Sequence, residues 1–397
     1  MEIIWSYLLV GLHVLFWFGV LGPALRRNLR AVPRLQRRVP RLTAWPRVTA
    51  IVPARNEERA LEASLRSLLA QTYPGLHVVC ANDGSTDRTR DIAAALAREF
   101  PGRLTLVDVP DLPDGWLGKP HAQHHAVQNA PADTDIYLFT DADVIHEPTT
   151  LQRAVAHLLR ERGDLLAIFP RVDCVGLFEN ATMPLLVHIG LAANDLRKLN
   201  DPKRRTAVGI GAFTMLRRGI YESFGGHAAI RGEVIDDMAL GLKTKQAGGR
   251  LCLVRDPRAV HLRMYHGGAE IVRGFEKNVQ TAVGGGVVRL ASYAALWLCI
   301  HLLPIVAALY ALAINGSEAK FALFLAACIA LATGETLAAR TRSFVRGNPL
   351  VTALFYPLGV LLMFVVFVRA SWHSVFRKTV RWRGRTTRIG PQQVRML

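Results

Sequence analysis

Two carboxylates lie close together in the stretch IYLFTDADVI, residues 136–145. Asp141 and Asp143 are one residue apart and directly follow five residues typical of a strand. Because residues i and i+2 of a strand lie on the same side, both carboxylates can converge on one point at its C-terminal end. Like charges this close are costly unless a cation lies between them. The spacing therefore predicts a cation site, and hard carboxylate oxygens suit Mg²⁺ or Mn²⁺.

The residues from 48 to 270 must position these carboxylates, and their pattern is that of a water-soluble α/β domain. Apolar, β-branched runs alternate with segments of helical spacing, which predicts a mostly parallel sheet with helices on both faces. The expected strands are 48–54, 76–83, 103–109 and 135–143, and the expected helices are 57–71, 87–100 and 121–130.

Polar clusters follow three of these strands. They are Arg-Asn-Glu at 55–57, Asn-Asp-Gly at 82–84 and Asp-Ala-Asp at 141–143. In open sheets of this kind, ligands bind beyond the carboxyl ends of the strands. We therefore expect the three clusters to border one ligand site.

Three sequence blocks, in this order, resemble the family 2 glycosyltransferases. IVPARNEE (51–58), VVCANDGSTDRT (78–89) and TDADV (140–144) resemble that family's opening strand, its D-G-S-x-D turn and its D-x-D element. A D-x-D pair also occurs in phosphatases of the haloacid dehalogenase type, but those continue with Gly-Thr, whereas Val144 and Ile145 follow here. The resemblance implies an α/β fold of the GT-A type, with a Rossmann-like, mostly parallel sheet.

The resemblance also implies a nucleotide-sugar donor, most often UDP-linked, and a Mg²⁺ or Mn²⁺ ion that stabilises the leaving diphosphate. It makes Asp143 the principal metal ligand and gives Asp141 a contact with the metal or the ribose. Asp83 would accept a hydrogen bond from the base, and Glu57 would help to seat the nucleoside. Without the other blocks, Asp83 would be interpreted as turn chemistry in Asn-Asp-Gly.

Lys119 lies in GWLGKPHAQHHA, after a glycine and before a proline at an expected helix start. It resembles the family's Gly-Lys element, which implies a contact with a donor phosphate. His121, His124 and His125 follow with i, i+3, i+4 spacing, which could form a metal site on one helical face. No carboxylate accompanies them, so we interpret them as a polar face beside the site.

Residues 224–251 resemble the acceptor half of the family, where an acidic pair is followed by two residues and a leucine; Asp237 and Leu240 fit that phase. An inverting transfer needs a base that takes the proton of the acceptor hydroxyl. We assign this role to Asp237, with Asp236 as the alternate. The helix dipole alone would also favour an acidic pair at a helix N-terminus.

Residues 270–278, EIVRGFEKN, lie where processive members of the family carry Q-x-x-R-W. Arg273 keeps the arginine and remains a candidate for donor binding, but Glu270 and Gly274 replace the glutamine and the tryptophan. This departure argues against a polymer threaded past the site. His261 could ligate the metal or the diphosphate, but we interpret it as a hydrogen-bonded strand histidine.

The chain of 397 residues has a net charge of +18, and 51% of its residues are hydrophobic. Basic residues crowd 26–47 and 377–388, where there is no acid, and both runs lie beside long apolar segments. This distribution favours membrane topology signals and anionic lipid heads over nucleic acid. The five cysteines show neither C-x-x-C nor zinc spacing, which indicates unpaired thiols in a reducing compartment.

Apolar segments at 3–22, 287–314, 321–338 and 350–370 are candidate membrane spans. The arginines after the first span predict a multi-pass protein of the cell (inner) membrane whose catalytic domain is cytoplasmic. An odd number of C-terminal spans would leave the basic tail outside, unless one segment re-enters or lies in the interface. The expected parts are a transmembrane anchor at 1–24, a basic juxtamembrane segment at 25–47, the GT-A domain at 48–280, transmembrane or interfacial helices at 281–372 and a basic tail at 373–397.

This layout resembles the ceramide glucosyltransferase-like, hopene-associated and carotenoid-acid glycosyltransferases. It implies an inverting, metal-dependent hexosyltransferase that moves a sugar from a UDP-linked donor to a hopanoid, carotenoid or sphingolipid-like membrane acceptor. The alternatives are a polysaccharide synthase, a polyprenyl-phosphate sugar transferase, or a non-catalytic membrane scaffold. A scaffold would need none of the four aspartates Asp83, Asp141, Asp143 and Asp237.

Overall fold

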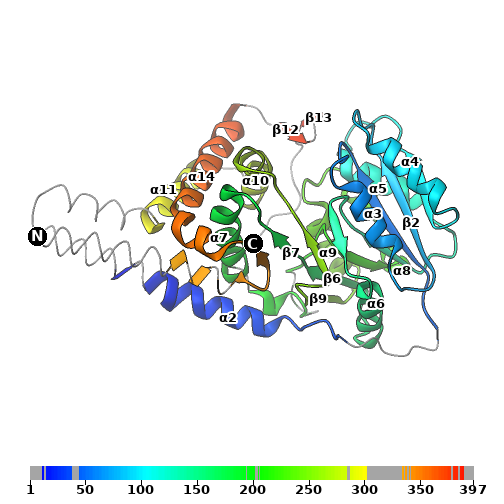
Figure 1. Cartoon of the computed structure of the whole chain (residues 1–397), viewed down its shortest axis with the longest axis horizontal. Coiled ribbons are helices and arrows are strands. Elements are labelled where there is room, and N and C mark those ends of the chain that lie inside the picture. The colour runs from blue at the N-terminus through cyan, green and yellow to red at the C-terminus, as the bar shows by residue number, and fades with distance from the viewer. Residues whose placement is uncertain are drawn as a thin grey trace, which may run out of the picture.

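The computed structural model shows an α/β domain joined to a layer of apolar helices (Figure 1). The domain contains α3, α4 and α5, and the helical layer contains α7, α10, α11 and α14. The structure describes residues 11–12, 15–37, 44–193, 195–201, 204, 206–283, 287–301, 333–334, 336–337, 339, 341–376, 379–382 and 385–388.

The larger sheet has seven strands in the order β3-β2-β1-β4-β8-β6-β9. β8 runs antiparallel to both of its neighbours, and the other strands are parallel to one another. The mostly parallel α/β sheet predicted from the sequence is therefore confirmed. The strands are β1 (Val48–Ala54), β2 (Leu76–Asn82), β3 (Leu104–Asp108), β4 (Ile136–Phe139), β6 (Leu165–Phe169), β8 (Thr214–Arg217) and β9 (Leu251–Arg255).

Helices cover both faces of this sheet, as the sequence pattern predicts. Every residue of β1 is buried, and successive residues enter different cores: Ala50 and Val52 lie in one hydrophobic cluster and Ile51 in the other. This two-residue alternation explains why the strand reads as a continuous apolar run. The helices of the domain are α3 (Leu61–Leu69), α4 (Thr89–Glu99), α5 (Gly118–Gln128), α6 (Thr150–Arg160), α8 (Arg218–Ser223), η3 (Gly226–Ile230) and α9 (Asp236–Gln246).

A second sheet of four short strands links the domain to the helical layer. Its order is β11-β7-β10-β5. β5 (Val144–His146) begins directly after Asp143, and β11 (Val345–Arg346) lies just before the long helix α14. The two inner strands are β7 (Arg171–Asp173) and β10 (Val260–Leu262). The D-x-D turn and the C-terminal helix are thus joined through one hydrogen-bonded sheet.

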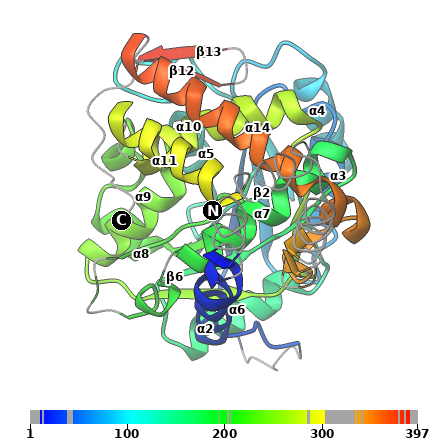
Figure 2. The same cartoon turned by 90° about the vertical axis from the view of Figure 1, so that its left-hand side faces the viewer.

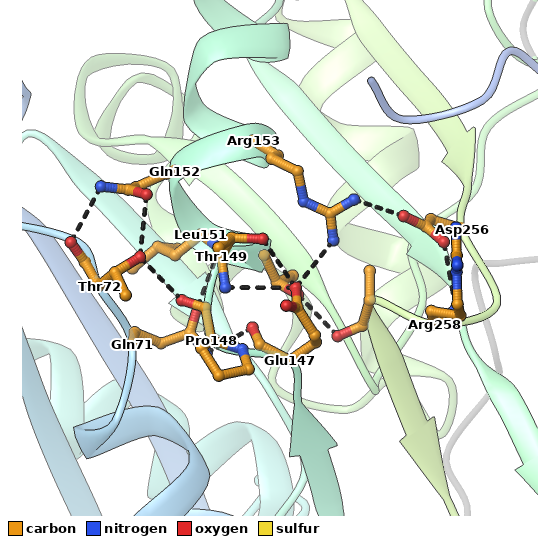
Figure 3. Close-up of polar contacts among 12 residues, drawn as sticks. Gln71, Thr72, Glu147, Pro148, Thr149, Leu151, Gln152, Arg153, Asp256 and Arg258 are labelled. Carbon is orange, nitrogen blue, oxygen red and sulfur yellow. Dashed lines mark hydrogen bonds and ion pairs between the residues drawn. The ribbon is translucent and has the colours of Figure 1, made fainter. Parts of the chain in front are cut away.

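A buried arginine fixes the outer end of this small sheet (Figure 3). Arg153, on α6, is 6% exposed, and its Nη1 lies 2.6 Å from Asp256 Oδ2 while Nη2 lies 3.1 Å from Glu147 Oε2. The Glu147 backbone N–H donates to the Ala259 carbonyl at 2.9 Å. Because the arginine bridges two carboxylates, it joins the residue after β5 to the turn before β10.

The helical layer contains η1 (Leu15–Leu21), α2 (Gly22–Ala31), α7 (Leu177–Ala193), η2 (Leu196–Lys198), α10 (Gly268–Val283), α11 (Val287–His301) and α14 (Pro349–Phe376). In the described part of the chain, α14 is the helix long and apolar enough to cross a membrane, over Pro349–Trp372. The apolar helix expected at 350–370 is therefore confirmed. Figure 2 views η1 and α2 nearly end-on, whereas α14 runs across the view.

The remaining expected spans fall largely outside the described residues. The span at 3–22 is described at 11–12 and from 15 onward, the one at 287–314 up to His301, and the one at 321–338 at four positions only. Of the basic tail, the structure describes the hairpin of β12 (Thr379–Trp382) and β13 (Arg385–Arg388). The number of spans remains a prediction.

The basic segment expected at 25–47 is described over residues 25–37 and 44–47, and parts of it lie against the rest of the molecule. The Asn28 side chain donates to the Leu191 carbonyl of α7 at 2.8 Å, and Leu25 beside it is buried. Farther on, the Leu35 N–H donates to the Arg255 carbonyl at 3.1 Å at the edge of β9. The arginines of α2 at 26, 27 and 30 remain exposed on its outer face.

Candidate active site

The first two polar clusters of the sequence lie in neighbouring loops at the carboxyl ends of β1 and β2. The Asp83 side chain is buried, and Arg55 Nη1 lies 4.0 Å from Asp83 Oδ2 and donates to the Gly84 carbonyl at 3.2 Å. The Glu57 N–H donates to Thr89 Oγ1 at 2.7 Å. Glu57 precedes α3 rather than lying in it, because the helix expected at 57–71 begins only at Leu61. The loops therefore bring Glu57 and Asp83 to the same edge of the sheet.

The D-x-D turn lies between β4 and β5, at the same edge. The Asp141 N–H donates to the Gly211 carbonyl at 3.1 Å, and Asp141 Oδ1 lies 2.7 Å from Lys119 Nζ. The Asp141 side chain is 35% exposed. Both aspartates thus lie in the turn after β4, which ends at Phe139, so the alternation of a strand does not extend to them.

Lys119, at the start of α5, connects the D-x-D turn to the acidic pair of α9. Its Nζ lies 2.7 Å from Asp141 Oδ1 and 3.4 Å from Asp236 Oδ2. Burial alone would lower the pKa of Lys119, but the carboxylates of Asp141, Asp236 and Asp237 together raise it well above its usual value. The lysine is therefore a fixed positive charge between residues predicted to bind the donor and residues predicted to activate the acceptor.

The two carboxyls of the acidic pair have different surroundings. Asp237 Oδ2 accepts from the Gly211 N–H at 2.7 Å, and Oδ1 accepts from the Met238 N–H at 2.8 Å. Burial, together with the charge of Asp236, raises the pKa of Asp237 to about 6, although Lys119 opposes the shift. Asp236 is buried and faces Lys119. A carboxyl with a pKa near 6 can accept and release a proton close to neutrality.

Two glycines that the sequence reasoning missed separate the D-x-D turn from the acidic pair. A Cβ at Gly211 would lie 2.7 Å from Asp141 Oδ2, and a Cβ at Gly209 would lie 1.9 Å from the Asp237 carbonyl oxygen. A side chain at Gly211 would displace the Asp141 carboxylate, and one at Gly209 would displace the Asp237 backbone. In the sequence, the feature that could have indicated these two positions is the Gly-x-Gly spacing at 209–211.

The histidines that follow Lys119 pack around an aromatic ring. The Trp116 ring centroid lies 5.5 Å from that of His121 and 5.0 Å from that of His124. Burial, with the neighbouring charge of His125, lowers the pKa of His124. Throughout the described ranges, no group of three His, Cys, Asp or Glu side chains is arranged to hold a metal ion.

The donor chemistry of the D-x-D turn nevertheless fits a divalent ion. Mg²⁺ is commonly held by one or two carboxylates together with substrate phosphates, rather than by a complete protein cage. Asp141 is part-exposed at the mouth of the sheet, and Asp143 is half-buried one residue away in the turn. The two side chains offer oxygen ligands, which suit Mg²⁺ and Mn²⁺.

Arg273 and His261 lie on elements beyond the large sheet. Arg273 is exposed on α10, and the glycine after it is explained by packing: a Cβ at Gly274 would lie 2.3 Å from the Tyr265 ring. His261 Nδ1 lies 2.9 Å from Asp173 Oδ2 on the neighbouring strand β7. The hydrogen bond agrees with our interpretation of His261 as a bonded strand histidine.

Comparisons with known proteins agree with this architecture. Residues 49–225 match the model of glycosyl transferase family 2. The 4,4'-diaponeurosporenoate glycosyltransferase of Staphylococcus aureus is 28% identical over 353 residues, which are 87% of this chain and 89% of that relative. The mannosyltransferase PcManGT of Pyrobaculum calidifontis, solved with GDP-Man and Mn²⁺, shares the fold at a TM-score of 0.52, with 20% identity over 95% of this chain and all of that one.

Proposed function

The chain contains a glycosyl transferase family 2 domain, and from this premise we propose that it is an inverting, metal-dependent hexosyltransferase acting on a membrane lipid. The observation that carries the proposal is the position of Lys119. One ammonium group contacts both the D-x-D carboxylate Asp141 and the acidic-pair carboxylate Asp236. Residues proposed for the donor and for the acceptor therefore border a single site.

On the donor side, we assign the nucleotide-sugar, which the resemblance makes UDP-linked, to the loops after β1, β2 and β4. Asp83 would accept from the base, Glu57 would seat the nucleoside, and Asp143 with Asp141 would hold a Mg²⁺ or Mn²⁺ ion. When bound, the ion supplies positive charge against the leaving diphosphate. The fold neighbour solved with GDP-Man and Mn²⁺ supports a nucleotide-sugar and a divalent ion. Arg273 is kept as an outer donor contact.

On the acceptor side, Asp237 takes the proton of the attacking group, with Asp236 as the alternate base. Two backbone N–H groups orient the Asp237 carboxylate. The pKa of about 6 leaves Asp237 ionised at neutral pH, as a base must be.

The acceptor is proposed to be an apolar lipid of the hopanoid, carotenoid or sphingolipid-like class. The name of the Staphylococcus aureus relative specifies diaponeurosporenoate, and the two chains are similar over most of their lengths. The apolar α14 beside the domain supports an acceptor that stays in the membrane. With the exposed arginines of α2, it also supports a protein of the cell (inner) membrane with a cytoplasmic domain.

Lipid mass spectrometry tests this proposal. Membranes from cells with the protein should contain a lipid heavier by one hexose, and cells with Asp143→Asn should not. Chelation with EDTA should abolish transfer, and Mg²⁺ or Mn²⁺ should restore it. A ladder of masses or a water-soluble polymer would instead favour the polysaccharide synthase. A glycosylated polyprenyl phosphate would favour a polyprenyl-phosphate sugar transferase. The absence of any transfer would favour a non-catalytic membrane scaffold.

A further inference from the structure

Both ends of α14 are attached to elements that lead out of the α/β domain. Just before the helix, Val345 and Arg346 pair with β7 as strand β11. Near its end, Arg369 Nε lies 3.2 Å from Glu276 Oε2 of α10, which begins six residues after β10. One end of α14 therefore contacts β7, and the other end contacts α10, which follows β10. β7 and β10 are adjacent strands of the small sheet.

The helix α7, which packs along α14, is tied to the domain at both of its ends. It follows β7 after only three residues. Beyond its other end, the Leu253 N–H of β9 donates to Asn200 Oδ1 at 2.6 Å. A helix with both ends held by one water-soluble domain lies along that domain. Because α14 and α7 share the hydrophobic cluster that contains Tyr356 and Leu185, α14 lies on the same layer.

The direction of α14 differs from that of the N-terminal helices. Figure 1 shows α2 along the long axis of the molecule, and Figure 2 shows α14 across that axis. η1 is the described end of the apolar run expected to span the membrane at 3–22. Transmembrane helices tilt by about 0–40° from the bilayer normal. If η1 follows the bilayer normal, α14, which runs in a different direction, is inclined to that normal.

One face of α14 is an apolar stripe that the protein leaves uncovered. Its members are 44% to 64% exposed and recur every three, four or seven residues, as one face of a helix does. They are Leu350, Leu354, Leu361, Val365, Val368 and Trp372. On the opposite face Val360 is fully buried, and its carbonyl accepts from Trp297 Nε1 at 3.0 Å. An apolar stripe of this length requires a cover.

The basic residues at both ends of α14 indicate which partner contacts the apolar stripe. Arg342 and Arg346 are exposed just before α14, and the acid-free run 377–388 follows it. If α14 crossed the bilayer, one of these basic groups would be on the outer side, against the preference of Lys and Arg for the cytoplasmic side. Both groups can face anionic lipid heads only if both ends of the helix lie on one side.

We propose that α14 lies flat in the membrane interface on the side of the glycosyltransferase domain, with its exposed stripe in the acyl region of the bilayer, and that it does not cross. The partner of this surface is an anionic lipid bilayer. The proposal rests on the membrane location in the proposed function. It places the basic tail beside the domain.

Spin labels on the stripe measure its depth. Single cysteines at Leu354, Leu361 and Val368, in a chain whose five native cysteines are alanine, would be labelled in anionic vesicles and probed with O₂ and a water-soluble nickel chelate. An in-plane helix gives three similar, shallow depths. A spanning helix places the first and last labels about 21 Å apart in depth, and that gradient would overturn the proposal. A label at Gly102, in the exposed turn before β3, is the water-accessible control.

A second experiment needs no cysteine replacement. One epitope tag is placed after Leu397 of the full chain and, in a separate variant, the same tag between Pro101 and Gly102. In intact spheroplasts, protease should spare both tags, and permeabilised cells should lose both. A C-terminal tag that is cleaved while the domain tag survives would overturn the in-plane helix, even with transfer intact. Both tags protected in a protein without transferase activity would count against the proposed function alone.

Discussion

At the scale of single residues, Lys119 links the two acidic parts of the candidate site. Its ammonium group contacts Asp141 of the D-x-D turn and Asp236 of the acidic pair. The sequence predicted only a phosphate contact for this lysine. Its second contact could not be predicted, because Asp236 is more than a hundred positions away in the chain.

Replacing Lys119 with Met should lower transfer by at least about 100-fold, because fixed charges aimed at the developing diphosphate charge are worth this much in other sites. Affinity for the nucleoside diphosphate, measured by calorimetry, should fall as well. Lys245→Met is the matched control: this half-buried lysine contacts backbone carbonyls, including that of Asp201 at 2.9 Å. It should lower the melting temperature and leave donor affinity unchanged. Equal affinities for the nucleoside diphosphate in the two variants would show that Lys119 does not contribute to donor binding.

Replacing Asp237 with Asn should preserve donor binding and lower turnover by about 10²–10⁴-fold, the usual loss for a general base. The proposed base is the ionised form of Asp237, whose pKa is about 6. Turnover should therefore be constant above this pH and fall about tenfold per pH unit below it. Rate measurements from pH 5 to 8 would show this fall in turnover on the acidic side. Near-normal turnover in the variant would indicate that Asp236, rather than Asp237, is the base.

At the scale of elements, a buried ion pair between Arg153 and Asp256 lies beside the outer strand of the small sheet. Replacing Arg153 with Met would leave Asp256 buried without its cation, which should lower the free energy of unfolding by about 3–5 kcal/mol. Denaturant titration in detergent measures the change. Arg160→Met is the control, since this arginine lies on the same helix but pairs with Glu161 at the surface, and it should cost about 1 kcal/mol or less. Equal losses would show that burial at Arg153 is unimportant.

The sequence predicted the elements whose signal is local, and it missed those formed by remote pairing. The strand 48–54 was predicted with the observed bounds, because β1 is buried along its whole length. The strands of the small sheet have two or three residues each, too few for a periodic pattern, and β11 pairs with a strand more than 170 positions earlier. In the site, carboxylates were recognisable by type and spacing. Gly209 and Gly211 matter through what a side chain would displace, which depends on the folded neighbours.

At the scale of the whole molecule, the exposed arginines of α2 should control how the protein binds to the bilayer. Transfer in vesicles should rise with the fraction of anionic lipid and fall with salt, because each arginine near such a surface contributes about 1 kcal/mol. Changing Arg26, Arg27 and Arg30 together to Gln should flatten both responses. Replacing Arg59 and Arg98, which are exposed on the domain, should leave them unchanged. Identical responses in all variants would contradict a role for α2.

The four-stranded sheet has a mechanical consequence. β11 is separated from α14 by two residues, and β5 follows Asp143 without a gap. In the proposed in-plane position, lateral pressure on α14 would reach the D-x-D turn, the proposed metal site, through paired strands rather than through a flexible linker. Turnover in vesicles with one headgroup should vary with acyl chain length, and a flat profile would contradict this coupling. A glycolipid product that stiffens its membrane would then adjust the rate of its own synthesis, without any second binding site.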